Sequence, residues 1–261
     1  MIGIFDSGLG GLTAYKEVRR LLPDEDIVYF GDTGRVPYGS RSKEVITKYA
    51  MQDMRFLMTK KVDAVLIACG TVTSTAIEVL RKNWSIPMIG VVDGACEAAV
   101  RLTGNKRIGV IATAATIMSG AFERKLKALD PGLSVTSRAC PLFVPLVESG
   151  FIDENDEVPR LVAERYLADI KADGCDTLIL GCTHYPVIAK TIARVLPGVN
   201  IVSSSLEAAK VMAKVRKDAK PGGGTTEFYV SDEPCGFETV ASIFLETEIG
   251  RDVKRISIED F

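Results

Sequence analysis

The chain has 261 residues, a formal net charge of −2, 25% charged residues and 47% hydrophobic residues. This composition is typical of a folded protein, and the length allows one large domain or two domains of roughly 100–150 residues each. The small net charge gives no electrostatic reason to expect nucleic acid or an anionic membrane surface as a partner. No apolar run in the sequence reaches the ~20 residues that a membrane span needs, and the N-terminus lacks the pattern of a signal peptide, so we expect a cytoplasmic protein.

Short apolar runs rich in β-branched residues alternate with helical stretches along the chain. Taken in order, the predicted strands cover residues 2–5, 27–30, 64–68, 88–92, 108–112, 133–137, 177–181 and 200–203. The predicted helices cover residues 12–22, 42–60, 73–82, 95–103, 119–128, 158–171 and 187–195. Strands that are apolar throughout and are each followed by a helix predict buried parallel sheets and an α/β fold.

The two halves of the sequence repeat this pattern. The strands at 2–5 and 108–112 both begin with Ile-Gly, and the segments 63–71 and 176–184 both consist of an Asp-led apolar strand that ends in cysteine. Any two α/β strands are similar, but the shared ending of a small residue, a cysteine and small polar residues favours two related halves. We therefore expect two similar parallel-sheet α/β domains.

The C-terminal segment is too short to form a domain of its own. It contains a glycine-rich loop at 217–226, followed by predicted strands at 227–230 and 253–258 around a helix at 237–245. We expect it to pack against the first half. The predicted division is residues 1–94 plus 207–261 for the first domain and residues 95–206 for the second.

Polar and reactive residues lie directly after several of the predicted strands, at the carboxyl ends of these strands. In parallel sheets, ligands bind beyond the carboxyl ends of the strands, and Asp6, Cys69, the 113–116 segment and Cys182 all lie there. If the two halves face each other, the two cysteines approach one cavity from opposite sides. A racemase needs this arrangement, because one group removes a proton from a carbon atom and another delivers a proton to its opposite face.

The cysteines and the single histidine limit the kinds of reactive site that the chain can form. The chain has six cysteines without a C-x-x-C pair, so we expect reduced thiols, and one histidine excludes histidine-rich metal sites. Most buried cysteines are inert, which is our expectation for the four at positions 96, 140, 175 and 235. A thiol needs help to act as a base near neutral pH; His184 is a candidate helper for Cys182 and Asp6 for Cys69.

Two loops have the composition of anion-binding turns. Residues 6–11 form a glycine-rich turn between a strand and a helix, which could present backbone N–H groups to an anion, although the spacing does not match a dinucleotide signature. In the loop 31–39, the sequence Pro37-Tyr38-Gly39 could offer backbone donors to a carboxylate. Each loop could also be an ordinary turn.

Several motifs together resemble one family. They lie at residues 5–13, 31–33, 36–39, 68–69, 144–150 and 181–186, and the last, Gly181-Cys182-Thr183-His184-Tyr185-Pro186, is highly specific. On these motifs the chain resembles the glutamate racemases of the aspartate/glutamate racemase superfamily. The resemblance implies two α/β domains related by pseudo-twofold symmetry with the site in the cleft between them. It also implies proton transfer between two bases without pyridoxal phosphate or metal, D-glutamate for peptidoglycan as the product, and a possible homodimer.

The resemblance also implies roles for individual residues. Cys69 would be the base toward the D-enantiomer and Cys182 toward the L-enantiomer, assisted by Asp6 and by His184 with Glu148 behind it. The residues that would hold the side-chain carboxylate are Ser7, Pro37, Tyr38 and Gly39. The amino-acid head would be held by the turn after Cys69, at Gly70 and Thr71, and by Thr116 and Thr183.

Three positions depart from the family pattern. Gly70 stands where the family has asparagine, Asp93-Gly94-Ala95 where a Glu-Pro-Gly-like turn is usual, and Ser203 where aspartate is common. We therefore expect Gly70→Asn to add a polar contact of ~1–3 kcal/mol if the chain acts on glutamate. The alternatives are an enzyme for another amino acid or dicarboxylate, and a non-catalytic binding protein with the same fold.

Overall fold

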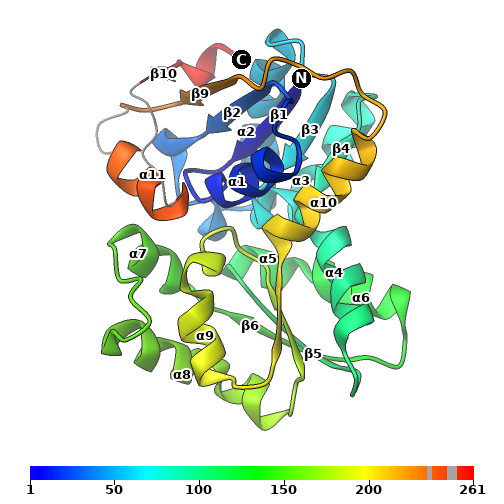
Figure 1. The fold of residues 1–261 in the computed structure, drawn as a ribbon, viewed down its shortest axis with the longest axis vertical. Coiled ribbons are helices and arrows are strands. Elements are labelled where there is room, and N and C mark those ends of the chain that lie inside the picture. Colours follow the sequence, from blue (N-terminus) through cyan, green and yellow to red (C-terminus); the bar gives the residue numbers. More distant parts are fainter. Residues whose placement is uncertain (234–236, 246–251) are drawn as a thin grey trace.

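The computed structural model describes residues 1–233, 237–245 and 252–261. Within these residues the strands form two parallel sheets, one in the upper and one in the lower part of Figure 1. The first sheet has the order β10-β9-β2-β1-β3-β4 and the second the order β6-β5-β7-β8. Every neighbouring pair is parallel, so the expected α/β fold with two parallel sheets is confirmed.

The strands have the following bounds. The first sheet contains β1 (Ile2–Asp6), β2 (Ile27–Gly31), β3 (Ala64–Ile67), β4 (Met88–Gly90), β9 (Thr226–Val230) and β10 (Val253–Arg255). The second sheet contains β5 (Arg107–Ala112), β6 (Ser134–Ala139), β7 (Thr177–Leu180) and β8 (Asn200–Ser203).

The strand order shows the internal repeat. In each half the first strand lies between the second and the third, and the fourth pairs with the third, giving β2-β1-β3-β4 and β6-β5-β7-β8. The cysteine-ending strands β3 and β7 therefore occupy equivalent places. The C-terminal segment adds β9 beside β2 and β10 beside β9, as expected for a segment that packs against the first half.

Helices cover both faces of each sheet, as buried parallel strands require. The longer helices are α1 (Leu12–Leu21), α2 (Lys43–Thr59), α3 (Gly70–Asn83), α4 (Val91–Leu102), α8 (Glu157–Ala172) and α10 (Ser204–Val215). The shorter ones are α5 (Ala114–Ser119), α6 (Ala121–Leu129), α7 (Phe143–Glu148), α9 (Ala189–Val195) and α11 (Phe237–Leu245). Single 3₁₀ turns form η1 (Thr33–Arg35), η2 (Tyr38–Ser40), η3 (Tyr185–Ile188) and η4 (Ile258–Asp260).

Some predicted boundaries were wrong. The strand predicted at 88–92 ends at Gly90, and Val91, whose N–H donates to Thr73 Oγ1, begins α4. A short buried apolar run does not distinguish the end of a strand from the first turn of a buried helix. Asp93, Gly94 and Ala95 all lie within α4, which begins four residues before the predicted helix start at residue 95. The strand predicted at 253–258 ends at Arg255, and Ile258 begins η4.

Other helices also differ from the predicted ones. Gly120 has a φ of +64° and separates α5 from α6, where one helix was predicted over 119–128. Helix α3 begins at Gly70, three residues before the predicted start. Helix α10 was not predicted at all; Ser203 caps it by accepting the Leu206 N–H through Oγ, so this departure from the family pattern has a structural role.

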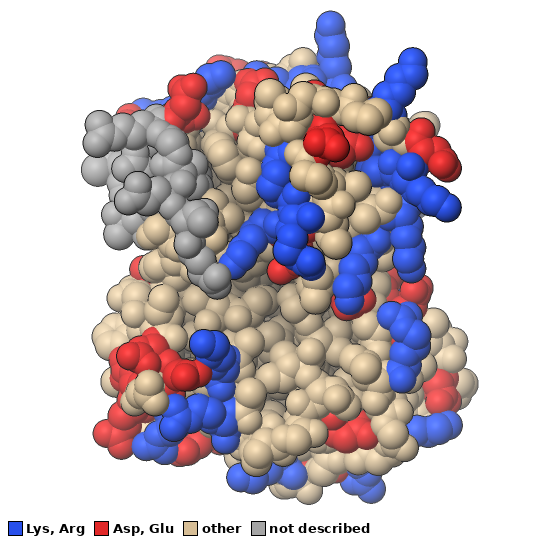
Figure 2. Space-filling model, in the orientation of Figure 1, with Lys and Arg blue, Asp and Glu red and all other residues tan. Residues whose placement is uncertain are grey.

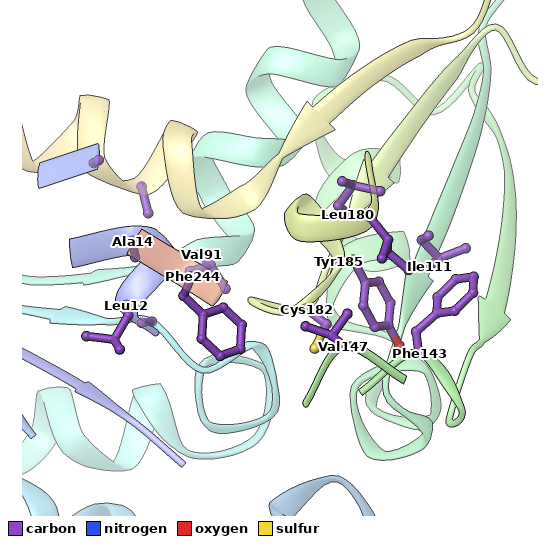
Figure 3. Packing of buried hydrophobic residues seen from close by; sticks show 14 of the residues in the cluster. Leu12, Ala14, Val91, Ile111, Phe143, Val147, Leu180, Cys182, Tyr185 and Phe244 are labelled. Carbon is purple, nitrogen blue, oxygen red and sulfur yellow. The ribbon is translucent and has the colours of Figure 1, made fainter. Parts of the chain in front are cut away.

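The apolar core extends to the residues around Cys182. Figure 3 shows Tyr185, Phe143 and Val147 packed behind Cys182, with Phe244 of α11 on the other side. The rings of Phe143 and Tyr185 meet edge to face at 5.2 Å, and the Tyr185 hydroxyl donates to the backbone carbonyl of Cys140 over 2.9 Å. This packing holds the turn after β7 in place.

The surface in Figure 2 has Lys and Arg side chains intermixed with Asp and Glu, in keeping with the small net charge.

None of the helices in the described part of the chain combines the length and the apolar character that crossing a membrane demands.

Candidate active site

A cavity of about 430 Å³ lies between the two halves, at the carboxyl ends of β1, β3 and β7. The first half lines it with Ser7, the segment 36–40 and residues 69–71, and the second with Thr113, Glu148 and residues 181–184. Of the site residues predicted from the sequence, Asp6 and Thr116 do not line it. Thr113 does, although it was noted only as part of a segment at the sheet edge.

Cys69 lies on the first-half wall of the cavity. It follows β3 at the N-cap position of α3, is 5% exposed, and its thiol donates to Ser7 Oγ over 3.4 Å. Burial and the nearby Asp6 carboxyl raise the pKa of Cys69 to about 12, against the opposing effects of Ser7 and the Val72 N–H. Cys69 is therefore a neutral thiol near pH 7, ready to donate a proton.

Cys182 lies on the opposite wall beside a charged histidine. His184 Nδ1 is 3.8 Å from Cys182 Sγ, and Nε2 is 2.9 Å from Glu148 Oε1. Burial lowers the pKa of His184, but its hydrogen bonds to Cys182 and Glu148 outweigh this effect and raise the pKa to about 10. The charged imidazolium form of His184 is thus favoured near neutral pH.

Asp6 lies beneath the glycine-rich turn rather than in the cavity. It is 1% exposed, and its Oδ2 accepts the Gly8 N–H over 3.0 Å, while Oδ1 has no hydrogen-bond partner among the described residues. Burial raises the pKa of Asp6, whereas the charge of His184 lowers it. The Gly8 N–H of this turn therefore binds the carboxyl group of the protein's own Asp6. No hydrogen bond joins Asp6 to Cys69 in the described part of the chain, so its assistance to Cys69 stays a prediction.

The segment 36–40 rests on a buried polar network that sequence reasoning missed. Tyr38 is 1% exposed, and its hydroxyl donates to Asp32 Oδ2 and, over 3.3 Å, to Asp53 Oδ2. Arg35 donates to both carboxyls, at 2.7 Å to Asp32 and 3.0 Å to Asp53. Burial and the charge of Asp32 raise the pKa of Asp53, and Arg35 opposes them. Asp53 lies on α2, and only its occurrence in an otherwise apolar helix face could have indicated it.

Three threonine hydroxyls form a cluster across the two halves. Thr71 Oγ1 of α3 is 3.0 Å from Thr113 Oγ1 and 3.4 Å from Thr116 Oγ1, and the latter two are 2.9 Å apart. Thr116 is 1% exposed, so it can act on a ligand only through its neighbours. Thr183 lines the cavity, with its backbone carbonyl accepting from Thr13 Oγ1 over 3.0 Å.

Gly70 lies at a close approach between the two halves. It lines the cavity, but a Cβ at this position would lie 2.3 Å from the backbone oxygen of Gly181. An asparagine therefore cannot be added to this backbone without a shift between the two segments, and the expected gain from Gly70→Asn stays a prediction.

The remaining cysteines lie away from the cavity. Cys96, Cys140 and Cys175 are buried and do not line it, and burial raises the pKa of all three. Cys235 lies outside the described residues. In the part of the chain that the structure describes, no three His, Cys, Asp or Glu residues are grouped to hold a metal ion.

Two parallel-sheet halves with a thiol on each wall of a shared cavity have the arrangement that an amino-acid racemase needs. The model of the Asp/Glu/Hydantoin racemase family matches residues 10–212. A glutamate racemase of Aquifex aeolicus is 46% identical over 248 residues, covering 95% of each chain. The chain therefore belongs to the aspartate/glutamate racemase superfamily, among the glutamate racemases, and is an amino-acid racemase.

Solved structures agree with this assignment. Glutamate racemase from Francisella tularensis in complex with D-glutamate superposes with a TM-score of 0.91 at 37% identity, covering 100% of this chain and 98% of that one. Glutamate racemase from Thermus thermophilus in complex with beta-chloro-D-alanine superposes with a TM-score of 0.88 at 40% identity, with the same coverage.

Proposed function

We propose that this protein interconverts L- and D-glutamate by proton transfer between Cys182 and Cys69. The observation that carries the proposal is the position of the two thiols, which line one cavity from opposite halves after the equivalent strands β3 and β7. The names of the relatives support glutamate as the substrate. The two domains would be residues 1–94 plus 207–261 and residues 95–206, each contributing one thiol.

From L-glutamate, the Cys182 thiolate removes the α-proton and leaves a carbanion. The Cys69 thiol then delivers its proton to the opposite face, which gives D-glutamate, a Cys182 thiol and a Cys69 thiolate. The reverse transfer, or proton exchange with water, restores the starting state. The His184 imidazolium supports the first step because it stabilises negative charge at Cys182 Sγ, and Glu148 keeps it oriented.

Substrate binding would use both walls of the cavity. Ser7 and the segment Pro37-Tyr38-Gly39 would hold the side-chain carboxylate, and the Tyr38 network would keep this segment rigid. The hydroxyls of Thr71 and Thr183 would hold the amino-acid head, with Thr116 acting through Thr113. Asp6 would accept or return a proton near Cys69, for which its raised pKa is suited.

The wider role rests on the family. The reaction would need neither pyridoxal phosphate nor a metal, since the two thiols supply both proton transfers. The product would be D-glutamate for peptidoglycan and hence for cell-wall growth and cell shape. A cytoplasmic location and a homodimer stay predictions.

Circular dichroism of L- and D-glutamate incubated with the protein tests the proposal. The signal of either enantiomer should decay to zero in the presence of a chelator, and Cys69→Ser and Cys182→Ser should each abolish the decay. Cys175→Ser is the matched control, because this thiol is buried outside the cavity. If a single active-site variant keeps the wild-type rate, the two-thiol mechanism is wrong.

Gly70 favours a second candidate, racemisation of another amino acid or dicarboxylate. The same measurement with a panel of L-amino acids separates the two. A faster decay for any other member of the panel would replace glutamate as the substrate and leave the two-thiol mechanism in place.

A further inference from the structure

Phe244 places an aromatic ring of the C-terminal segment against His184 of the opposite half. It lies on α11, which follows β9 of the first sheet in the chain, and it is 2% exposed. The rings of Phe244 and His184 meet edge to face, with centroids 5.2 Å apart and planes at 90°. In Figure 3, Phe244 lies on the side of Cys182 opposite to Phe143 and Tyr185. The C-terminal segment therefore covers a histidine that the other half supplies.

The other neighbours of His184 leave its side chain little contact with solvent. Its Nε2 is 2.9 Å from Glu148 Oε1, and its Nδ1 is 3.8 Å from Cys182 Sγ. On the first half, a Cβ on Gly10 would lie 2.4 Å from His184 Cε1, so the backbone at Gly10 packs against the ring. Together with Phe244, these contacts leave the His184 side chain 8% exposed.

Truncation of Phe244 would admit water beside His184. The space left by a phenyl ring is larger than a water molecule, and the ion pair between His184 and Glu148 offers water polar partners. Water beside two charges raises the effective dielectric constant and weakens their interaction. The attraction between the imidazolium and the Cys182 sulfur, across 3.8 Å, therefore depends on the exclusion of water by Phe244.

We propose that Phe244 is a positioning residue for Cys182, which acts by excluding water from His184. The proposal rests on the two-thiol mechanism, in which the His184 imidazolium stabilises negative charge on Cys182. In the described part of the chain, Phe244 makes no ring contact or hydrogen bond with Cys69, whose thiol donates to Ser7. Loss of the Phe244 ring should therefore impair the thiol on one wall and spare the thiol on the other.

A 3-chloro analogue of glutamate reports on one thiol at a time. The thiolate removes the α-proton, chloride leaves C3 with its electron pair, and water hydrolyses the resulting enamine to 2-oxoglutarate and ammonium. In the proposed mechanism, Cys182 acts on the L-form of the analogue and Cys69 on the D-form. Chloride release from the two forms therefore measures the two thiols separately.

The first variant is Phe244→Ala, with Ile243→Ala as the matched control. A residue that acts through His184 should cost less than the about 10²–10⁴-fold of a general acid–base group, so chloride release from the L-form should fall about ten-fold. Release from the D-form should stay within a few-fold of wild type. Ile243 is half-buried on the same helix, and its truncation should leave both rates unchanged. Equal losses from the two forms in Phe244→Ala, or no loss from either, would overturn the proposal.

The variants Phe244→Met and Phe244→Gln separate the exclusion of water from the filling of space. Their side chains are similar in length, but methionine is apolar and glutamine carries an amide that binds water. Phe244→Met should keep chloride release from the L-form within a few-fold of wild type, and Phe244→Gln should lower it about ten-fold. Equal rates in these two variants would contradict the proposal. The comparison remains decisive if Phe244→Ala does not fold.

A double variant tests whether Phe244 acts through His184. In His184→Asn no imidazolium is left to shield, so the addition of Phe244→Ala should cause no further loss of chloride release from the L-form. Losses that multiply to the product of the two single effects would show that Phe244 acts elsewhere, and the proposal would be wrong. Thermal unfolding identifies a temperature at which the variants are folded, and the rates are compared there.

The wild-type protein distinguishes the two proposals. Failure of the wild type to racemise glutamate would contradict the proposed function. If the wild type racemises glutamate and Phe244→Ala releases chloride from the L-form at the wild-type rate, the proposed function stands and only the proposal for Phe244 fails.

Discussion

The two halves present their thiols in different surroundings although their strand order is the same. Cys69 is the N-cap residue of a long helix and is a neutral thiol, because burial and Asp6 raise its pKa to about 12. Cys182 precedes a 3₁₀ turn and faces the His184 imidazolium, which is bonded to Glu148. The two halves therefore share a fold but differ in the chemical surroundings of their thiols. In the proposed mechanism, this difference makes Cys182 the base and Cys69 the acid for L-glutamate.

The segments after the second strand of each half differ in the same way. In the first half, the segment after β2 contributes Tyr38 and is supported from below by Arg35 and Asp53. In the second half, the segment after β6 contributes Glu148, whose side chain is 45% exposed and which orients His184. One segment is held by buried ion pairs and hydrogen bonds, and the other supplies a charged partner to His184.

The largest expected effect is that of His184→Asn, which removes the cation beside Cys182. General acid–base groups contribute about 10²–10⁴-fold to rates, and racemisation should fall within this range. Because the two enantiomers have equal free energy, kcat/KM must fall equally in both directions, so racemisation alone cannot show which thiol is affected. Chloride release from the L-form of the 3-chloro analogue should fall, and release from the D-form should persist. Equal losses from both forms would show that His184 does not act on Cys182 alone.

The next effect is that of Asp53→Asn, which weakens the support beneath Tyr38. Hydrogen bonds to charged groups contribute about 1.5–3 kcal/mol, so KM for both enantiomers should rise about ten-fold or more while kcat changes less. Lys48→Ala, an exposed change on the same helix, is the control. A fall in kcat with unchanged KM would show that the network serves proton transfer and not the binding wall.

The pH dependence of stability sharpens the assignment of charge to His184. Its pKa is raised from 6.5 to about 10 in the folded protein, so its stabilising contribution is fully present below pH 6.5 and is lost as the pH rises through about 10. Urea unfolding should therefore show a falling free energy of unfolding over this window. The loss should be smaller in His184→Asn, in which other titrating groups remain; identical profiles would mean that His184 is not charged.

The smallest effect concerns the helices that follow the fourth strands. Helix α4 begins after Gly90, which has no capping side chain, whereas α10 is capped by Ser203 Oγ. Ser203→Ala should lower the free energy of unfolding by about 1 kcal/mol without changing racemisation, and Ser203→Asp should restore the cap. A change in KM for Ser203→Ala would instead assign this position to the substrate.

Much of this architecture could be predicted because it depends on local pattern. Apolar runs followed by helices specify parallel strands, and cysteines placed directly after two such strands are brought to the same edge whatever the details of packing. Errors came where one local pattern fits two structures, as for residues 88–92, or where a side chain acts as a cap, as Ser203 does for α10.

The sequence by itself determined the α/β fold, its internal repeat and the pair of cysteines, because these follow from periodicity and from position relative to a strand. Only the tertiary structure decided the charge of His184, which depends on burial and on Glu148, 36 residues away in the chain. It alone also decided that Gly70 touches Gly181 and that Arg35 and Asp53 support Tyr38. Burial and contact between distant segments set these properties, and no local pattern encodes a distance between two halves of a chain.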